Sequence, residues 1–269
     1  MAKTILILSD GLRYDVAKDN MGFLGHLVES KLASLYKIIG ELPSMSRPMY
    51  ETVHTGVPSS EHGIVANSIV RLSSKPNIFQ VVKSAGKVTA AAAYYWVSEL
   101  YNRAPYDRIE DKEVDNEELA IQHGRFYTQD EYPDIELFNS AAHLVCKFSP
   151  DYLLLHPMGM DYHGETYGSD SKEYRNHAVQ QDAWLAPLIQ EWMERGYTIM
   201  VTGDHGINKD GAHGGPAPEQ REVPLYLIRP NVAGQGDTQQ IVSHLQIAPT
   251  VLKLLDLPIP ETMKQPSLV

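Results

Sequence analysis

The sequence predicts an α/β protein built on a mostly parallel central sheet with helices on both faces. Two observations support this class. Short apolar runs alternate with longer segments of helical periodicity, as in strand–helix–strand units. Several apolar runs also end in polar, glycine-containing clusters, which is where such sheets place their ligands. A chain of 269 residues is long enough for one domain with a large core.

The predicted elements alternate along the chain. The first strand is an uncharged, β-branched run at residues 4–8, followed by a helical pattern. The apolar runs predicted as strands are 4–8, 88–96, 152–156, 198–202 and 223–228. The segments predicted as helices are 16–31, 77–84, 135–147, 171–195 and 244–255.

Residues 101–133 form the least regular stretch. It contains an acidic run, around which the aromatic residues Tyr106, Phe126, Tyr127 and Tyr132 are spread. We predict a solvated insertion or lid within a single catalytic domain that spans residues 1–269. The alternative is a cap that contributes to the choice of substrate.

Composition excludes several classes of protein. There are 34 acidic and 23 basic residues, and the net charge of −11 disfavours binding to a nucleic-acid polymer or a membrane surface. A small anionic substrate stays compatible, since bound cations can reverse the local charge. Cys146 is the only cysteine, which excludes a disulfide within the chain and a cysteine-based zinc cluster. The chain has no signal-peptide pattern and no apolar run near the ~20 residues of a membrane helix, so we expect a cytoplasmic protein.

Four polar clusters carry the candidate chemistry. Taken singly, each has an ordinary explanation, such as a turn at an Asp-Gly pair or a helix cap at a serine. Three of them follow strands 4–8, 152–156 and 198–202, so they should meet at one edge of a parallel sheet. The clusters are Asp10-Gly11, Ser46-Arg47-Pro48, Asp161-Tyr162-His163-Gly164-Glu165, and Asp204-His205-Gly206 followed by His213-Gly214-Gly215.

This edge would gather three aspartates, a glutamate, up to three histidines and a serine hydroxyl. So many carboxylates cannot lie together unless cations neutralise them. Mixed Asp and His ligands suit zinc or manganese, and magnesium is possible at an oxygen-rich site. Two divalent ions explain the number of ligands better than one. The other histidines are interpreted as structural: His62 fixes a turn near the site, and His26, His143, His177 and His244 lie on the surface or on helix faces.

The motifs together resemble the alkaline-phosphatase superfamily, and within it the type I phosphodiesterase/nucleotide pyrophosphatase branch. The similarity runs from residue 4 to about residue 258 and the motifs are jointly specific. They are Asp10-Gly11-Leu12-Arg13, Ser46-x-Pro48 with Thr55-Gly56, Pro58-x-x-x-His62-Gly63-Ile64, Asp204-His205-Gly206, His213-Gly214-Gly215 and Ile247-Ala248-Pro249-Thr250.

The resemblance implies a mechanism and a ligand set. One metal ion would be held by Asp10, Asp204 and His205 and would touch Ser46, and the other would be held by Asp161, Glu165 and His213. Ser46 would attack phosphorus to give a phosphoserine intermediate. The expected cofactors are two divalent ions, zinc first and manganese or magnesium as alternatives. The expected partner is a small phosphorylated substrate, a phosphodiester or a phosphomonoester, and a homo-oligomer is possible.

The sequence departs from the branch at two places. Glu165 stands where the branch has a histidine ligand, so either Glu165 or His163 completes the set, and the spacing from Asp161 favours Glu165. Met49 stands where we expect an asparagine that contacts the phosphoryl oxygens, and we predict Arg47 as its substitute and as a catalytic residue.

Other functions are kept as alternatives. A phosphonate hydrolase or a phosphosugar mutase belongs to the same superfamily, although a mutase usually needs a larger insertion than residues 101–133. A sulfatase is disfavoured because those enzymes need Cys or Ser in a C/S-x-P-x-R pattern, and here Tyr50 occupies the position of the arginine, four residues after Ser46. An inactive binding module is the alternative from another class.

Overall fold

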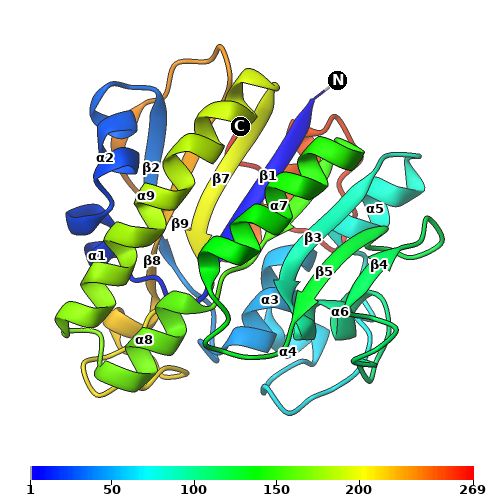
Figure 1. Ribbon diagram of the computed structural model, residues 1–269, viewed down its shortest axis with the longest axis horizontal. Helices are drawn as coiled ribbons and strands as arrows, with labels where there is room; N and C mark the ends of the chain where they lie inside the picture. Colours follow the sequence, from blue (N-terminus) through cyan, green and yellow to red (C-terminus); the bar gives the residue numbers. More distant parts are fainter. Residues whose placement is uncertain (1) are drawn as a thin grey trace.

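The computed structural model describes residues 2–269, and these form a nine-stranded sheet (Figure 1). The strand order is β4-β5-β3-β6-β1-β7-β8-β2-β9. The strands are β1 (Lys3–Ser9), β2 (Ala33–Ile39), β3 (Thr89–Tyr94), β4 (Glu113–Asp115), β5 (His123–Tyr127), β6 (Tyr152–Leu155), β7 (Tyr197–Gly203), β8 (Glu222–Ile228) and β9 (Gly236–Val242).

The centre of the sheet is parallel. β1 lies between β6 and β7 and runs parallel to both, with Ile5 opposite Leu153 on one side and Ile199 on the other. β3 and β5 continue the parallel set beyond β6. β8 is antiparallel to β7 and β2, and β4 is antiparallel to β5. The sheet is therefore mostly parallel, as predicted, with two antiparallel strands.

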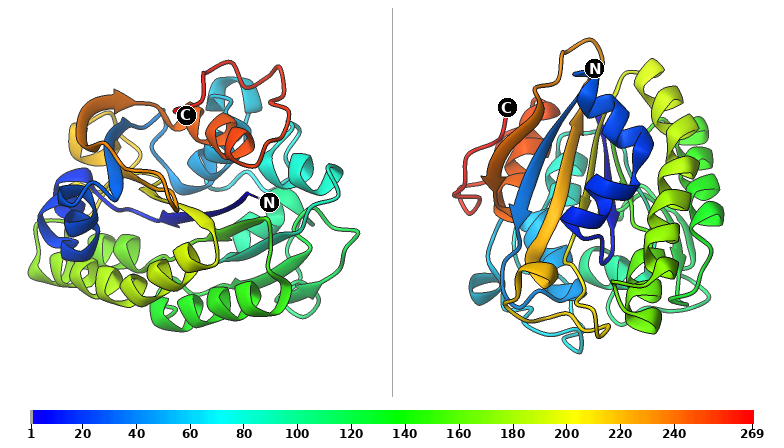
Figure 2. Two further views of the ribbon diagram at one scale, coloured as in Figure 1. Left: turned by 90° about the horizontal axis from the view of Figure 1, so that it is seen from above. Right: turned by 90° about the vertical axis from the view of Figure 1, so that its left-hand side faces the viewer.

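Helices cover both faces, as Figure 2 shows in the view from above. The alternation of side chains along β1 feeds two cores: Ile5 and Ile7 pack with α7 (Asp134–Phe148) and α9 (Lys172–Glu194), whereas Leu6 and Leu8 pack with helices of the other face. That other face carries α3 (Ser46–Thr55), α5 (Ile78–Ser84) and α11 (Ile247–Leu254). The remaining helices are α1 (Tyr14–Asn20), α2 (Gly22–Glu29), α4 (Ser59–His62), α6 (Tyr95–Tyr101), α8 (Gly159–Tyr167), α10 (Pro218–Arg221) and the short 3-10 helix η1 (His244–Gln246).

The predicted elements are largely confirmed, with three differences. The strand predicted at 88–96 ends at Tyr94, because α6 begins at Tyr95. The helix predicted at 16–31 is two helices that meet at Met21. Strand β2 and the edge strand β9 were not predicted; β9 is mostly exposed and lacks the apolar run on which strand prediction relies.

Residues 101–133, predicted as an irregular insertion or lid, contain β4 and β5. These strands extend the sheet beyond β3 and form its edge, so the stretch is more regular than expected. β5 is mostly buried along its length. Within residues 2–269, no helix combines the length and the apolar character needed to cross a membrane.

Helix α3 carries a buried carboxyl group that makes the stability of the fold depend on pH. Burial raises the pKa of Glu51 from 4.5 to about 7, although Ser73 donates a hydrogen bond to it. Between these two values the folded state binds more protons than the unfolded state, so the free energy of unfolding falls as pH rises from about 4.5 to about 7.

We expect Glu51→Gln to remove this dependence, since an amide of the same shape keeps the bond from Ser73 and carries no charge. Each pKa unit corresponds to about 1.4 kcal/mol, so above pH 7 the variant should gain up to about 3 kcal/mol over wild type. Urea unfolding of both proteins at acidic and alkaline pH measures the difference. Parallel pH profiles for the two proteins would show that Glu51 does not titrate in this range.

Candidate active site

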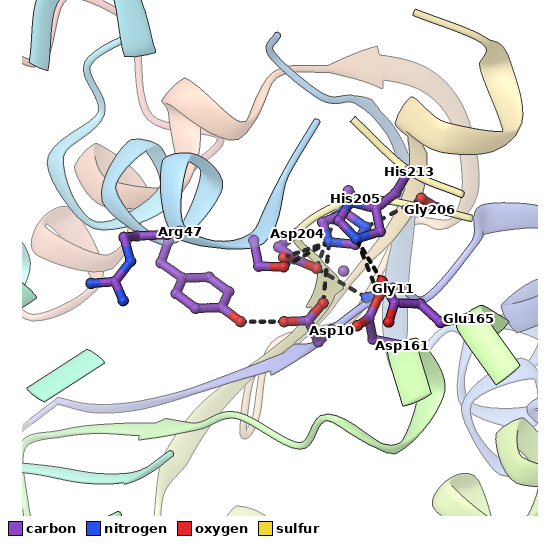
Figure 3. Close-up of polar contacts among 12 residues, drawn as sticks. Asp10, Gly11, Arg47, Asp161, Glu165, Asp204, His205, Gly206 and His213 are labelled. Atoms are coloured by element: carbon purple, nitrogen blue, oxygen red, sulfur yellow. Dashed lines mark hydrogen bonds and ion pairs between the residues drawn. The ribbon is translucent and has the colours of Figure 1, made fainter. Parts of the chain in front are cut away.

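The carboxyl ends of three neighbouring parallel strands bring the predicted residues together (Figure 3). Asp10 directly follows β1, and Asp204 directly follows β7, whose last residue is paired with Ser9. Asp161 lies in α8, the helix that follows β6. The convergence predicted from the sequence is thus found in the structure.

Gly11 allows α8 to approach the end of β1 closely. Its φ of +73° lies in the left-handed region, and a Cβ added to it would lie 2.8 Å from the Cα of Asp161. Because Gly11 has no side chain, the backbone at Asp161 can lie close to the end of β1, which brings Asp161 near Asp10.

One group of candidate metal ligands consists of Asp10, Asp204 and His205, all fully buried. His205 Nε2 lies 3.2 Å from Asp10 Oδ1 and 3.4 Å from Asp204 Oδ2. The second oxygen of Asp204 accepts hydrogen bonds from the backbone N–H groups of Gly11 and His205, at 3.0 and 2.8 Å. These bonds fix the carboxylate and leave Oδ2 directed at the group.

The second group consists of Asp161, His205 and His213. His213 Nε2 lies 4.0 Å from Asp161 Oδ1, and its ring stacks on that of His205 with centroids 4.1 Å apart. Glu165 Oε1 lies 3.1 Å from His213 Nε2, at the exposed side of the group. His205 is close enough to belong to both groups, so the structure joins them into one cluster.

The oxygen and nitrogen atoms of this cluster suit the coordination of divalent metal ions. Among the buried atoms without a hydrogen-bond partner within residues 2–269, four belong to these ligand residues: Asp10 Oδ1, Asp161 Oδ1, Asp204 Oδ2 and His213 Nδ1. Leaving such groups unsatisfied is costly, and three of the four are carboxylate oxygens pointing into one cluster. Carboxylate oxygens and imidazole nitrogens are the ligands that zinc and manganese accept.

The pKa values of the residues in the cluster are shifted strongly from their usual values. Burial and the neighbouring charge of Asp10 raise the pKa of Asp204 to about 6 and hold that of Asp161 well above its usual value. Burial disfavours a charge on Asp10, but the imidazoles of His156 and His205 beside its carboxylate outweigh this and lower its pKa. Burial likewise opposes a charge on His205, but Asp204 and Asp10 raise its pKa to about 10. The raised pKa values mean that Asp161, Asp204 and His205 bind protons more readily, and metal ions would compete with these protons for the same atoms.

Ser46 is the first residue of α3 and its hydroxyl faces the cluster. The side chain is almost fully buried, and Oγ lies 3.1 Å from His205 Nε2. Tyr50, one turn further along α3, donates a hydrogen bond from its hydroxyl to Asp10 Oδ2. This bond ties the nucleophile helix to the end of β1.

Comparison with known proteins identifies the family of the chain. The model of the type I phosphodiesterase/nucleotide pyrophosphatase family matches residues 4–210, well over half of the chain. The chain belongs to this family. The family resemblance stated from the motifs is thereby confirmed, and the alkaline-phosphatase-like core with it.

Two solved structures share the fold of this chain. Murine ectonucleotide pyrophosphatase/phosphodiesterase 5 superposes with a TM-score of 0.71 at 14% identity, covering 96% of each chain. The phosphonate monoester hydrolase of Silicibacter pomeroyi superposes with a TM-score of 0.70 at 14% identity, covering 100% of this chain and 76% of that one. At these identities the likeness concerns the fold alone.

Curated relatives of this family member include two ethanolamine phosphate transferases. GPI ethanolamine phosphate transferase 2 of Candida albicans is 30% identical over 122 residues, which cover 41% of this chain and 14% of the relative. The catalytic subunit of human GPI ethanolamine phosphate transferase 2 is 22% identical over 277 residues, covering 97% of this chain and 27% of the relative. The chain thus corresponds to about a quarter or less of the length of these relatives.

The structure places Glu165, and not His163, beside His213. Residues 159–167 form α8, so Asp161 and Glu165 are one helical turn apart and project from the same face. His163 turns elsewhere: its Nδ1 lies 2.7 Å from the carbonyl oxygen of Gly159, and its ring stacks on His177. The spacing argument made from the sequence therefore matches the geometry.

The structure does not bring the side chain of Arg47 to the cluster. The guanidinium is buried, donates to Glu99 Oε2 at 2.7 Å, and stacks over Trp96 at 4.5 Å; in Figure 3 it points away from Asp10. The ion pair and the stacking hold it there, which corrects the prediction that Arg47 contacts phosphoryl oxygens. Met49, the position at which we expected an asparagine, is fully buried.

An asparagine reaches the nucleophile from a different segment. Asn67 Oδ1 accepts a hydrogen bond of 3.0 Å from the backbone N–H of Arg47, so this amide lies beside the start of α3. The bond engages the amide oxygen of Asn67 and leaves its NH₂ group free of this contact, and Arg47 directly follows Ser46 in the chain. Its place beside α3 depends on the path of the loop that follows α4, and no local sequence pattern marks it.

Sequence reasoning also missed His156 and misplaced two other histidines. His156 ends the predicted strand 152–156, and its Nε2 lies 3.2 Å from Asp10 Oδ2. His177 and His244 are buried rather than superficial: His177 Nε2 lies 2.7 Å from Asp134 Oδ2, and His244 Nε2 lies 2.8 Å from the carbonyl oxygen of Gly203. His62 does stabilise a turn, accepting a hydrogen bond from the N–H of Ile64.

Proposed function

We propose that this family member is a metal-dependent phosphoesterase in which Ser46 attacks the phosphorus of a small phosphodiester or phosphomonoester. The observation that supports this most strongly is the position of the Ser46 hydroxyl. It lies 3.1 Å from His205 Nε2, and His205 belongs to both candidate metal groups. If His205 Nε2 coordinates a metal ion it cannot also accept the proton of Ser46, so the serine hydroxyl would depend on the cation to become a nucleophile near neutral pH.

We assign two divalent ions to the cluster. Asp10, Asp204 and His205 would hold one beside Ser46, and Asp161, Glu165 and His213 would hold the other. Zinc is the first expectation and manganese or magnesium are the alternatives. When bound, the ions supply positive charge that lowers the pKa of the serine hydroxyl and stabilises the departing oxygen.

The chain's own residues provide the nucleophile and orient the phosphoryl group. Ser46 Oγ forms a bond to phosphorus while the bond from phosphorus to the leaving oxygen breaks and the hydroxyl proton is lost, so that a protonated alcohol or phenol is released. The intermediate is phosphoserine from a monoester, and a phosphoserine that keeps the second ester group from a diester. Water then forms the new P–O bond as the bond to Oγ breaks, which restores the serine and releases the phosphate product. The NH₂ group of Asn67 and the positive end of the α3 dipole favour the anionic phosphoryl group at this place.

A transfer reaction is the second candidate. The curated relatives are named as ethanolamine phosphate transferases, and in such a reaction an alcohol would accept the group from Ser46 in place of water. Phosphonate hydrolysis needs the same residues and is a third outcome of the same assay. Products formed with and without an added alcohol distinguish hydrolysis from transfer.

The test is a substrate panel with zinc, manganese and magnesium supplied separately. Bis(4-nitrophenyl) phosphate, 4-nitrophenyl phosphate and 4-nitrophenyl phenylphosphonate represent the three classes of ester. We expect the metal-loaded protein to cleave at least one phosphate ester and the chelated protein to cleave none. Equal activity of the chelated protein would contradict the metal dependence, and no cleavage with any metal would contradict the proposed function.

Metal binding should also stabilise the fold. The ions would neutralise the buried carboxylates, which otherwise repel one another. A ligand present at one hundred times its Kd adds about 2.7 kcal/mol to the free energy of unfolding. For a chain of this size we expect Tm to rise by roughly 5 °C or more on adding manganese to the chelated protein. Differential scanning calorimetry measures the rise. The same titration of Asp204→Asn is the control; an equal rise in that variant would place the bound ions elsewhere.

A further inference from the structure

A cavity lies in the segment 101–133, at the end of β5 and away from the cluster of candidate metal ligands. Its volume is about 190 Å³. Like the cluster, it lies at the carboxyl ends of the parallel strands, because β5, β3, β6 and β1 are consecutive parallel strands. Side chains that line it include Tyr106, Arg108, Lys112, Phe126, Tyr127 and Tyr132.

The cavity gathers two cations that have no acidic partner. The segment holds four basic residues, and two of them are paired: Arg103 with Asp111, at 2.9 Å, and Arg125 with Asp115, at 3.1 Å. Arg108 and Lys112 line the cavity, and neither side chain forms an ion pair within residues 2–269. This is unexpected in a segment with such an excess of carboxylates, and it favours an anionic ligand.

The walls of the cavity add aromatic surface and a hydrogen-bond donor. The rings of Tyr127 and Tyr132 stack with centroids 5.0 Å apart. The hydroxyl of Tyr106 is buried and has no hydrogen-bond partner in the described part of the chain. Burial and the charge of Asp111 raise the pKa of Tyr106 to about 12, so the hydroxyl keeps its proton and can donate it.

Two chains of contacts connect this cavity to the reacting centre. Tyr127 donates to the carbonyl oxygen of His156 at 2.8 Å, and the ring of His156 contacts Asp10. On the other side, the N–H of Tyr106 donates to Glu99, which pairs with Arg47, the residue next to Ser46. Three strand spacings of ~4.8 Å separate β5 from β1, so the cavity lies about 14 Å from the phosphorus site.

We propose that this cavity is a substrate subsite for a second anionic group, a carboxylate or a phosphate, on the part of the ester that does not react. Arg108 and Lys112 bind the anion, Tyr106 donates a hydrogen bond to it, and the Tyr127–Tyr132 pair covers the apolar portion beside it. The inference rests on the proposed function for its role in catalysis, whereas the binding of an anion in the cavity stands apart from it.

The kinetic test uses a matched pair of 4-nitrophenyl phosphate diesters. One carries an ω-hydroxy carboxylic acid of about ten carbons, to suit the separation of the two sites, and the other carries the simple alcohol of equal length. We expect the carboxylate to lower KM about tenfold in wild type, the effect of a charge-assisted hydrogen bond. Arg108→Gln and Lys112→Gln should each remove most of that advantage and leave turnover of the plain diester unchanged. Arg103→Gln, which removes a charge outside the cavity, should keep the advantage.

The binding test uses terephthalate, a rigid aromatic dicarboxylate without an ester bond, titrated into chelated protein by calorimetry. We expect binding to wild type and to Arg103→Gln, and its loss in Arg108→Gln and Lys112→Gln. Equal binding to all four proteins, or to none, would overturn the subsite. Loss confined to the two cavity variants, with no ester cleaved by wild type, would keep the subsite and reject the proposed function.

Discussion

Replacement of Ser46 by alanine is expected to abolish turnover while the fold and the metal content stay nearly unchanged. Ser46 is the residue whose Oγ contacts the metal cluster from the start of α3, and it would form the covalent bond to phosphorus. Loss of a covalent nucleophile costs on the order of 10⁴ or more in rate. Ser46 is the first helical residue of α3 and not its N-cap, which is Met45, so its removal should cost about 1 kcal/mol or less in stability.

The measurements are kcat/KM, Tm and bound metal for the variant and for a matched control. Ser44→Ala removes a hydroxyl two residues earlier, which donates to the carbonyl oxygen of Gly215. We expect the control to keep activity within about tenfold of wild type, since a neutral hydrogen bond contributes about 1 kcal/mol. Wild-type activity in Ser46→Ala would assign the nucleophile to another group.

Glu165→Gln is expected to weaken the binding of one metal ion sharply and to leave the other in place. Its carboxylate lies 3.1 Å from His213 Nε2 and on the same face of α8 as Asp161. Neutralising a ligand removes both a donor oxygen and a compensating charge, so we expect a loss of affinity of about a hundredfold or more. Elemental analysis after dialysis should fall from two ions per chain to one.

Two further variants make this result specific. His163→Ala should keep both ions, because the ring of His163 contacts Gly159 and His177 and not His213. Glu165→His should keep activity and move the metal preference toward zinc, since imidazole is a softer ligand than carboxylate. If His163→Ala lost an ion and Glu165→Gln kept both, the ligand would be His163.

The sequence was sufficient to predict the positions of those functional residues that directly follow a strand. Asp10 and Asp204 end neighbouring parallel strands, and such ends must meet at one edge whatever the loops do. The spacing from Asp161 to Glu165 equals one helical turn, and α8 turned out to be a helix. Local pattern and strand direction together therefore predicted most of the cluster.

Residues whose position depends on tertiary contacts could not be predicted in this way. Arg47 is adjacent to the nucleophile in the chain, yet Glu99 and Trp96 hold its side chain away from the cluster. Asn67 reaches the start of α3 through a loop whose path has no local sequence signal. The antiparallel direction of β8 between β7 and β2 likewise follows from packing and not from hydrophobic periodicity.

The central claim is that the reaction proceeds in two displacements through Ser46. The stereochemistry at phosphorus tests it most directly, using a phosphorothioate diester of one configuration hydrolysed in water enriched in heavy oxygen. Each in-line displacement inverts phosphorus, so attack by Ser46 followed by attack by water predicts overall retention. Inversion would show a single direct attack by water and would contradict the phosphoserine route.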